Sequence, residues 1–386
     1  MDSFSDKPRL KALLDHFADI KDEREAWRVA YPLPEVLFLV VCGTLASCDD
    51  FDDIVEWGEA HLGFLRRFLP YHHGIPGVRW LNILINRIDP GLFSACFMSW
   101  ATSLRPDAPE IIALDGKTSR RSHDNANGKA ALHLVSAFAT HEKLVLGQEA
   151  VADKSNEITA IPALLERLAE SGALDKALVT VDAMGCNPRV TQSIRDAGAD
   201  YLIALKRNQA SLYDDVQHLF DDPQTAEKMD RHTEHDKGHG RLEKRTAYIC
   251  TDISWMQRSR PCPGEHRFPD LSGLVCVENL IEEKGKTTQE RRFYITSRPM
   301  NAKEALHAVR EHWRIENSLH WVLDITFKDD LSRVRKGHGA KNMAVVRHFA
   351  INLVRNAKDK KSIKTRRKLA GWSTDYMISL LVNPDS

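Results

Sequence analysis

Three strands in a row are predicted by the segments IIALD (111–115), LHLVSAF (132–138) and LVLGQEAV (144–151), which are separated by polar and glycine-containing turns. Two further apolar segments of the buried-strand type follow, ALVTVD (177–182) and DYLIALK (200–206). Apolar residues at helical spacing separate the last three strands, which predicts two connecting helices. The predicted order is therefore strand, strand, strand, helix, strand, helix, strand.

This order indicates an α/β fold with a mixed sheet. Three sequential strands form an antiparallel meander, whereas strand–helix–strand units form parallel pairs whose helices cover the faces of the sheet. We expect a five-stranded mixed sheet in the spatial order 3-2-1-4-5, with helices on both faces. That arrangement is ribonuclease-H-like.

The regions on either side of this segment differ from it. Residues 1–105 form the first predicted domain, which is helical and is interrupted by prolines. Residues 106–386 form the second, in which residues 207–300 are predicted to insert a polar, histidine-rich loop followed by strands at about 242–250, 274–281 and 291–298. A long helix is predicted to resume at Ala302, with Asn301 as its N-cap and Glu304 completing a capping box. Basic helices are expected over residues 331–386.

The composition excludes several classes of protein. With 42% apolar and 28% charged residues, the 386-residue chain resembles globular proteins and neither a disordered nor a fibrous one. Its seven cysteines are scattered, as in proteins of a reducing compartment. The N-terminus lacks the apolar segment of a secretory signal, and the longest apolar run, Val36 to Cys48, is shorter than the roughly 20 residues that span a bilayer. We expect a cytoplasmic protein with no membrane partner.

Charge is unevenly distributed, although 54 basic residues balance 54 acidic ones. Residues 331–368 contain 13 Lys or Arg and one acid, Asp359. Such a cluster indicates a polyanionic partner such as DNA, and the alternative is a solvated helical face. The residues expected to contact DNA here are Arg333, Arg335, Lys336, Lys360, Lys361, Arg366 and Arg367.

Three acids are candidates for a metal site. Asp115 and Asp182 end two predicted strands that are neighbours in the sheet order, and ligand sites of such sheets lie beyond the carboxyl ends of the strands. Glu316 is flanked four residues away by His312 and His320 on one helical face. Clustered carboxylates suit two Mg²⁺ or Mn²⁺ ions and phosphodiester chemistry. The alternatives are capping roles for the two aspartates and a surface ion pair for Glu316.

Two further features allow a functional and an ordinary interpretation. Lys117 follows Asp115 closely enough to contact a phosphate, but a surface lysine is an equally good interpretation. His232, His235 and His239 have spacing loosely like that of zinc ligands, without an obvious fourth ligand, and a solvated or DNA-facing loop is the favoured interpretation.

Several longer motifs of the chain resemble a known family. They are DHFADIKDER (15–24), HGIP (73–76), DGKTSRRS (115–122), DKSNEI (153–158), TVDAMGCN (180–187), YLIALKRNQ (201–209), KGHGRLEKR (237–245), RRFYITSR (291–298) and HWRIENSLHWVLDITFKDD (312–330). Together they closely resemble the H-repeat-associated group of bacterial insertion-sequence transposases, in the DDE superfamily. The resemblance runs from about residue 10 to residue 358.

The resemblance implies a function and assigns the site residues. Asp115, Asp182 and Glu316 match the catalytic triad, which holds Mg²⁺ or Mn²⁺. The implied activity is metal-dependent cleavage and strand transfer of double-stranded DNA at the ends of an insertion sequence, by a nucleoid-associated protein that is a homodimer on those ends. The N-terminal domain would bind the terminal repeats or help in dimer contacts. Two alternatives stay open: an inactive DNA-binding relic or repressor, and a metal-dependent nuclease without strand transfer. A two-carboxylate glycosidase is least favoured, because it would explain neither the basic cluster nor the third acid.

Overall fold

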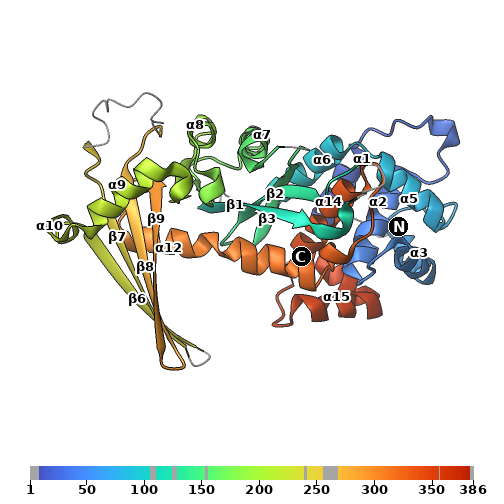
Figure 1. The fold of residues 1–386 in the computed structure, drawn as a ribbon. Helices are drawn as coiled ribbons and strands as arrows, with labels where there is room; N and C mark the ends of the chain where they lie inside the picture. The colour runs from blue at the N-terminus through green and yellow to red at the C-terminus, as the bar shows by residue number, and fades with distance from the viewer. Residues whose placement is uncertain are drawn as a thin grey trace.

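The computed structural model describes residues 8–104, 110–123, 128–152, 155–238, 241–254, 268–355 and 357–382. One mixed sheet runs through the molecule, with a helical body at one end and long hairpins at the other (Figure 1). The five strands predicted from the sequence are β1 (Ile111–Ser119), β2 (Leu132–Ala139), β3 (Leu144–Ala150), β4 (Leu178–Val181) and β5 (Asp200–Leu205). The chain is therefore a mixed α/β protein.

The sheet is larger than predicted. Its order is β3-β2-β1-β4-β5-β9-β8-β7-β6, so the first five strands lie in the predicted order, but within the described part of the chain the sheet has nine strands. The five-stranded prediction was wrong because β9 (Lys286–Thr296) pairs antiparallel with β5, from Leu202 opposite Thr296 to Leu205 opposite Phe293. The inserted strands thus continue the same sheet. Among the described strands, β1–β4 and β4–β5 are the parallel pairs, and the other pairs are antiparallel.

The inserted region begins with helices and a strand where a loop was predicted. Helices α9 (Ala210–Asp221) and α10 (Pro223–Ala226) are followed by β6 (Asp230–Gly238), β7 (Arg241–Cys250) and β8 (Gly273–Glu283). The polar segment that contains His232 and His235 is strand β6, which pairs along its whole length with β7. His239, the third residue of the zinc hypothesis, lies outside the described residues.

A two-residue turn joins β8 to β9. Glu283 pairs with Lys286, and both intervening residues, Lys284 and Gly285, have positive φ angles of 51° and 73°. Two positive φ angles are the geometry of a type I′ turn, which matches the twist of a hairpin and favours glycine. The chain can therefore reverse direction between β8 and β9 within two residues.

Helices pack on both faces of the sheet (Figure 1). One face carries α7 (Glu157–Glu170) and α8 (Pro188–Asp196), and the other carries α12 (Ala302–His312), whose buried alanines and leucine pack on the parallel strands and the insertion. The predicted capping box is confirmed: the Asn301 side chain accepts from the Glu304 amide, and the Glu304 side chain accepts from the Asn301 amide. This cap fixes where α12 begins.

The helical end of the molecule combines residues from both ends of the chain. The N-terminal helices are α1 (Pro8–Ala18), α2 (Leu33–Leu45), α3 (Phe51–Ala60), α4 (Leu62–Leu65), α5 (Val78–Arg87) and α6 (Pro90–Ser103). Helix α14 (Gly339–Arg355) packs among α2, α5, α6 and β3. Every residue from 342 to 354 is buried, so this part of the basic region is a core helix and has no broad solvated face. Two further helices follow, α15 (Ile363–Trp372) and α16 (Thr374–Leu381).

Within the described ranges, none of the helices has both the length and the apolar content needed to cross a membrane.

Candidate functional site

Asp115 lies at the point where β1 loses its parallel neighbour. The parallel pairing of β1 with β4 ends at Leu114 opposite Val181, while the antiparallel pairing of β1 with β2 continues to Ser119. Asp115 therefore stands inside a strand, and the prediction that it ends the strand was wrong. Because the pairing with β4 stops one residue earlier, the Asp115 side chain is next to an open position at the edge of the parallel strands.

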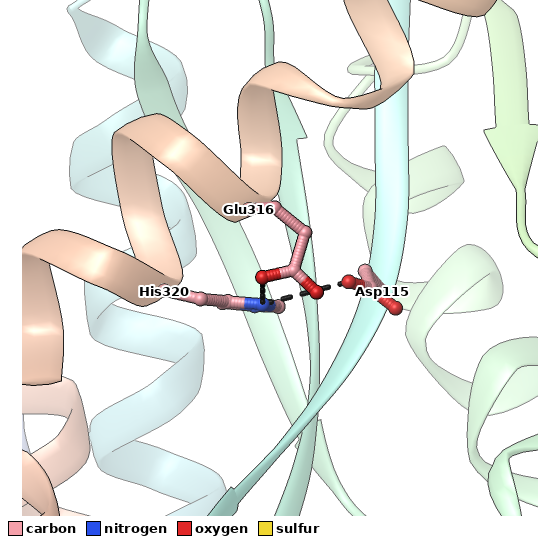
Figure 2. Close-up of side chains that lie close together, drawn as sticks. All are labelled: Asp115, Glu316 and His320. Atoms are coloured by element: carbon pink, nitrogen blue, oxygen red, sulfur yellow. Dashed lines mark ion pairs between the residues drawn. The ribbon is translucent and has the colours of Figure 1, made fainter. Parts of the chain in front are cut away.

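Glu316 and His320 reach Asp115 from the segment that follows α12. Residues Ile315–His320 form a π-helical turn, η6, between α12 and α13 (Trp321–Ile325). Such turns are rare and occur frequently at functional sites. The turn brings the His320 Nδ1 atom 3.6 Å from Glu316 Oε2 and 3.5 Å from Asp115 Oδ2. Figure 2 shows the three side chains converging from the strand and the helical segment.

The two carboxylates influence each other strongly. Burial, then the negative charges of Glu316, Asp182 and Glu157, raise the pKa of Asp115 well above its ordinary range. The neighbouring His320 ring, with further help from Asp115, lowers the pKa of Glu316 despite its partial burial. A proton is therefore held more tightly by Asp115 than by Glu316, and a cation bound between the two carboxylates would favour the ionised form of both.

The donor set of this cluster fits a divalent cation. One ligand atom from each of Asp115, Glu316 and His320 can be chosen so that all three lie within 4.8 Å of one another. Glu316 is half exposed, with 51% of its side-chain surface accessible, whereas His320 is buried at 5%. The cluster is thus reachable from solvent on the glutamate side. The sequence had drawn attention to His320 only as a neighbour of Glu316.

Asp182 lies directly after β4, beside Asp115 along the neighbouring strands, but it has a local partner of its own. Its Oδ1 accepts a hydrogen bond of 2.9 Å from the Met184 amide and caps the short helix η4 (Ala183–Gly185). Among the described residues its oxygens are not part of the 4.8 Å cluster. The structure therefore brings Asp115 and Glu316 together, and it leaves Asp182 near them as a charge that acts on Asp115.

His312 does not join the cluster. Its Nδ1 lies 3.0 Å from the Thr180 hydroxyl of β4, and burial lowers its pKa to about 4. A neutral imidazole in this place packs α12 on the sheet and brings no positive charge to Asp182. Of the two histidines flanking Glu316 in the sequence, only His320 therefore contacts the carboxylates.

A second polar group lies against the other face of β1. The His133 ring connects the Thr118 hydroxyl, 2.7 Å from Nδ1, to Glu157 Oε1, 2.8 Å from Nε2. Gly116 leaves the room for it, because a Cβ atom there would come within 2.0 Å of Glu157 Oε1. Glu157 begins α7 and belongs to the motif at 153–158, for which sequence analysis assigned no role.

The structure corrects the assignment of Lys117 to DNA. Its ammonium lies 2.7 Å from Asp324 Oδ1, 3.1 Å from Asp329 Oδ2 and 3.5 Å from Asp330 Oδ1, and only 11% of its side chain is exposed. Burial by itself would lower the pKa of Lys117, but these acids outweigh it and raise the pKa. The lysine is committed to these three carboxylates and has little access to solvent, so it is not available to a phosphate.

Arg366 and Arg367 are also corrected. Arg366 donates from Nε to Asp359 Oδ1 at 2.9 Å and from Nη1 to the Val354 carbonyl at 3.1 Å. Arg367 donates to the Thr44 carbonyl at 2.8 Å and to the Thr326 carbonyl, with its guanidinium 4.0 Å from the Phe327 ring centroid. Both residues are buried, so they fasten α15 to the helical body and are not available to DNA.

The other predicted DNA contacts lie at the surface or partly so. Arg333, Lys336, Lys360 and Lys361 are exposed, whereas Arg335 is half-buried and donates to the Arg121 carbonyl at 3.0 Å. Lys361 also pairs with Asp359 at 3.3 Å. These five residues keep their predicted role as a hypothesis about DNA.

Two known protein families match most of the chain. Residues 106–353 match the family described as the Transposase DDE domain, and residues 14–101 match the DDE_Tnp_1-associated family. The chain belongs to the DDE transposase family. The three acids selected from the sequence all lie within the larger matched region.

Full-length relatives support this membership. The chain is 36% identical to "Putative transposase YncI" of Escherichia coli O157:H7, covering 97% of this chain and 95% of that protein. It is 33% identical to "H repeat-associated putative transposase YhhI" of Escherichia coli K12, covering 96% and 98%. The chain is also similar to a solved piggyBac transposase synaptic complex with hairpin DNA at 11% identity and a TM-score of 0.44, covering 99% of this chain and 81% of that one.

Proposed function

We propose that this transposase-family chain binds the ends of an insertion sequence in double-stranded DNA and catalyses metal-dependent strand cleavage and strand transfer. The observation that carries the proposal is the cluster of Asp115, Glu316 and His320 at the edge of the parallel strands, with ligand atoms within 4.8 Å of one another. Asp182 is the third acid of the triad. The strand order β3-β2-β1-β4-β5 supports a ribonuclease-H-like core around it.

Each residue would have a distinct part in this reaction. Asp115 and Asp182 would hold one Mg²⁺ or Mn²⁺, and Asp115 with Glu316 would hold a second. When bound, two such ions would stabilise the charge that develops on the attacking and the leaving oxygen of a phosphodiester. Glu316, the most exposed of the three, lies where it can meet the substrate. His320 would orient both carboxylates and complement their charge through Nδ1.

The DNA would be held by groups outside the cluster. Arg333, Arg335, Lys336, Lys360 and Lys361 would contact phosphates, which contribute affinity without sequence information. Residues 1–105 would read the terminal repeats, and a homodimer would pair the two ends. Cleavage would free a 3′-hydroxyl that attacks target DNA, so the products to look for are joined strands as well as cut ones.

The test uses the full-length protein and DNA that carries the element's own ends. Asp115→Asn and Glu316→Gln keep the shapes of the side chains but remove a ligand charge, so Mg²⁺-dependent cleavage should be lost while DNA binding stays near the wild-type level. The exposed Glu166 of α7 provides a control, because Glu166→Gln changes a carboxylate far along another helix. Cutting by Asp115→Asn at the wild-type rate would refute the assignment.

The same assay separates the alternative functions. Cut strands without joined products would indicate a nuclease. A wild-type protein that binds the ends but cuts with neither Mg²⁺ nor Mn²⁺ would indicate a DNA-binding relic, and the proposal would then fail.

A further inference from the structure

We propose that Lys117 is a positioning residue, which fixes the helix carrying Glu316 and His320 in register against the strand carrying Asp115. This inference rests on the proposed function, because it concerns how the same site is assembled. The observation behind it is the ion pair of 2.7 Å between the Lys117 ammonium and Asp324 Oδ1. It joins β1 to α13 two residues beyond Asp115 in the strand and four residues beyond His320 in the helix.

The Asp115–His320 contact and the Lys117–Asp324 ion pair form two parallel connections, here called rungs, between β1 and the helical segment. Side chains of residues two apart in a strand share a face and are roughly 6.6 Å apart along the strand, and four residues of a helix advance about 6 Å. The contact of Asp115 with His320 and the contact of Lys117 with Asp324 therefore match in direction and step. Sliding the helix by one residue, about 1.5 Å, would break both rungs together.

Burial explains why the second rung is stiff. Lys117 is 11% exposed, and Asp329, which accepts its hydrogen bond of 3.1 Å, is 7% exposed. Asp329 is paired at the same time with buried Arg347 of α14, at 2.8 Å. Charges with little access to water interact more strongly than surface pairs and resist separation. The cluster therefore connects β1, α13 and α14 around a single ammonium.

The cluster is an ion-pair network and not a second metal centre, although oxygens of Asp324, Asp329 and Asp330 lie within 4.8 Å of one another. Lys117 and Arg347 contact these acids, and the Arg120 Nε atom lies 3.3 Å from Asp330 Oδ2. Three cations thus balance three carboxylates. Among the described residues, Asp329 also pairs with Arg347 and Asp330 with Arg120, whereas Asp324 pairs with Lys117 alone. Loss of the lysine charge should therefore release α13 first.

The expected effect of breaking the rung is a looser site in an otherwise folded protein. Asp324 is 33% exposed, so Asp324→Asn costs little desolvation and keeps the shape of the side chain. Without its charge the segment Ile315–Ile325 should move against β1, and Glu316 should spend less time near Asp115. Substitutions of groups that orient metal ligands typically reduce metal affinity or activity about 10- to 100-fold. We expect an effect at the low end, about 10-fold, for Asp324→Asn.

The experiment compares Asp324→Asn, Lys117→Met and Lys117→Arg with the wild type in the full-length protein. Lys303→Met is the control, since Lys303 is an exposed lysine on α12, the helix that leads into the same segment. Four properties are measured: Mn²⁺ affinity by electron paramagnetic resonance without DNA, cleavage of end-bearing DNA, thermal unfolding in EDTA, and hydrogen–deuterium exchange over residues 315–325 in EDTA.

A positioning role predicts a particular combination of results. Asp324→Asn should bind Mn²⁺ about 10-fold more weakly and cut more slowly by a similar factor, at a melting temperature close to that of the wild type. Amides of 315–325 should exchange faster while those of 302–312 keep the wild-type rate. Lys117→Arg should recover part of the loss seen in Lys117→Met, because it keeps the charge. If Lys117→Met does not fold, Asp324→Asn decides the question.

Failure of this inference differs from failure of the proposed function. If the wild type binds Mn²⁺ and cuts, and Asp324→Asn matches it in affinity, cleavage and exchange, the positioning role is overturned and the proposed function stands. If the wild type neither binds Mn²⁺ nor cuts, the proposed function falls. Exchange over residues 315–325 in EDTA still decides whether Lys117 holds the segment, since that measurement needs neither metal nor DNA.

Discussion

Replacing Arg367 by methionine should destabilise the protein and leave its affinity for DNA unchanged. Arg367 is one of 13 basic residues in the stretch 331–368, which from the sequence suggests a DNA contact. In the structure it is 3% exposed. Its guanidinium donates to the carbonyl of Thr44, in the last turn of α2, and to the carbonyl of Thr326, just after α13.

The size of the effect follows from these two acceptors. Carbonyl groups at the end of a helix lack intrahelical partners, and a cation near that end also interacts favourably with the helix dipole. A hydrogen bond from a charged donor contributes about 1.5–3 kcal/mol. We take the low end for each carbonyl, because burial opposes the guanidinium charge and lowers the pKa of Arg367 to about 10. Two bonds then give a loss of about 3 kcal/mol, or roughly 150-fold in the unfolding equilibrium.

Urea unfolding of Arg367→Met beside Lys368→Met measures this loss. Lys368 is the neighbouring residue and is exposed, so its substitution should change the free energy of unfolding by less than about 0.5 kcal/mol. DNA titrations of Arg367→Met at three salt concentrations should give the wild-type slope. The reasoning is refuted if Arg367→Met keeps the wild-type stability, or if its salt slope falls by about 0.9, as expected for one lost phosphate contact.

Three further predictions follow from other parts of the structure. Replacing Arg333, Lys336, Lys360 and Lys361 by Gln should weaken binding to end-bearing and random duplexes equally and reduce the salt slope by up to about 0.9 per lost contact; an unchanged slope in such titrations would mean a merely solvated surface. Gly116→Ala should separate Glu157 from His133, because the added Cβ would lie 2.0 Å from Glu157 Oε1. The free energy of unfolding in urea should fall by about 1–3 kcal/mol. The control Gly63→Ala, whose Cβ would meet nothing within 4 Å, should leave the free energy of unfolding unchanged. Burial lowers the pKa of His348 to about 3, so the unfolded chain binds a proton at higher pH than the folded protein does. The free energy of unfolding should therefore be greatest above about pH 6.5 and fall as the pH drops toward 3. His348→Gln should flatten this dependence in urea unfolding between about pH 7.5 and 5, and an equally steep dependence in the variant would contradict the prediction.

The strands that carry the site could be predicted because strands buried on both faces consist of apolar residues. Segments such as ALVTVD (177–182) are apolar throughout, which is the pattern of a strand covered on both faces. The Asn301 capping box was predictable for a similar reason, since it needs only two residues at a fixed spacing. Strand β6 has no such pattern. Its exposed edge position leaves DRHTEHDKG without apolar alternation, and backbone pairing with β7 together with ion pairs from Glu234 and Asp236 to Arg310 of α12 holds it as a strand.

The direction in which a charge faces could not be predicted from its position in the chain. Arg347, Arg367 and Lys360 are all basic residues of the same stretch. In the structure, however, Arg347 pairs with Asp329 and Arg367 donates a hydrogen bond to a helix carbonyl. Their partners lie 18 and 323 residues away, so no local pattern announces them. The same holds for Lys117, whose partners lie more than 200 residues further along the chain. A run of basic residues therefore predicts a basic surface only for those residues that have no acid or carbonyl partner inside the protein.

Subtracting those partners changes where DNA is expected to be held relative to the carboxylates. Arg347, Arg366, Arg367 and Lys117 are committed to internal contacts, and the cations that remain exposed include Arg333 and Lys336, which follow the ion-pair network of Asp329 and Asp330. The network is linked through α13 to Glu316. Phosphate contacts at 333–336 would therefore lie next to the ion pairs that connect β1 to the helical segment carrying Glu316. The same ion pairs would then set both the geometry of the carboxylates and the position of the bound strand.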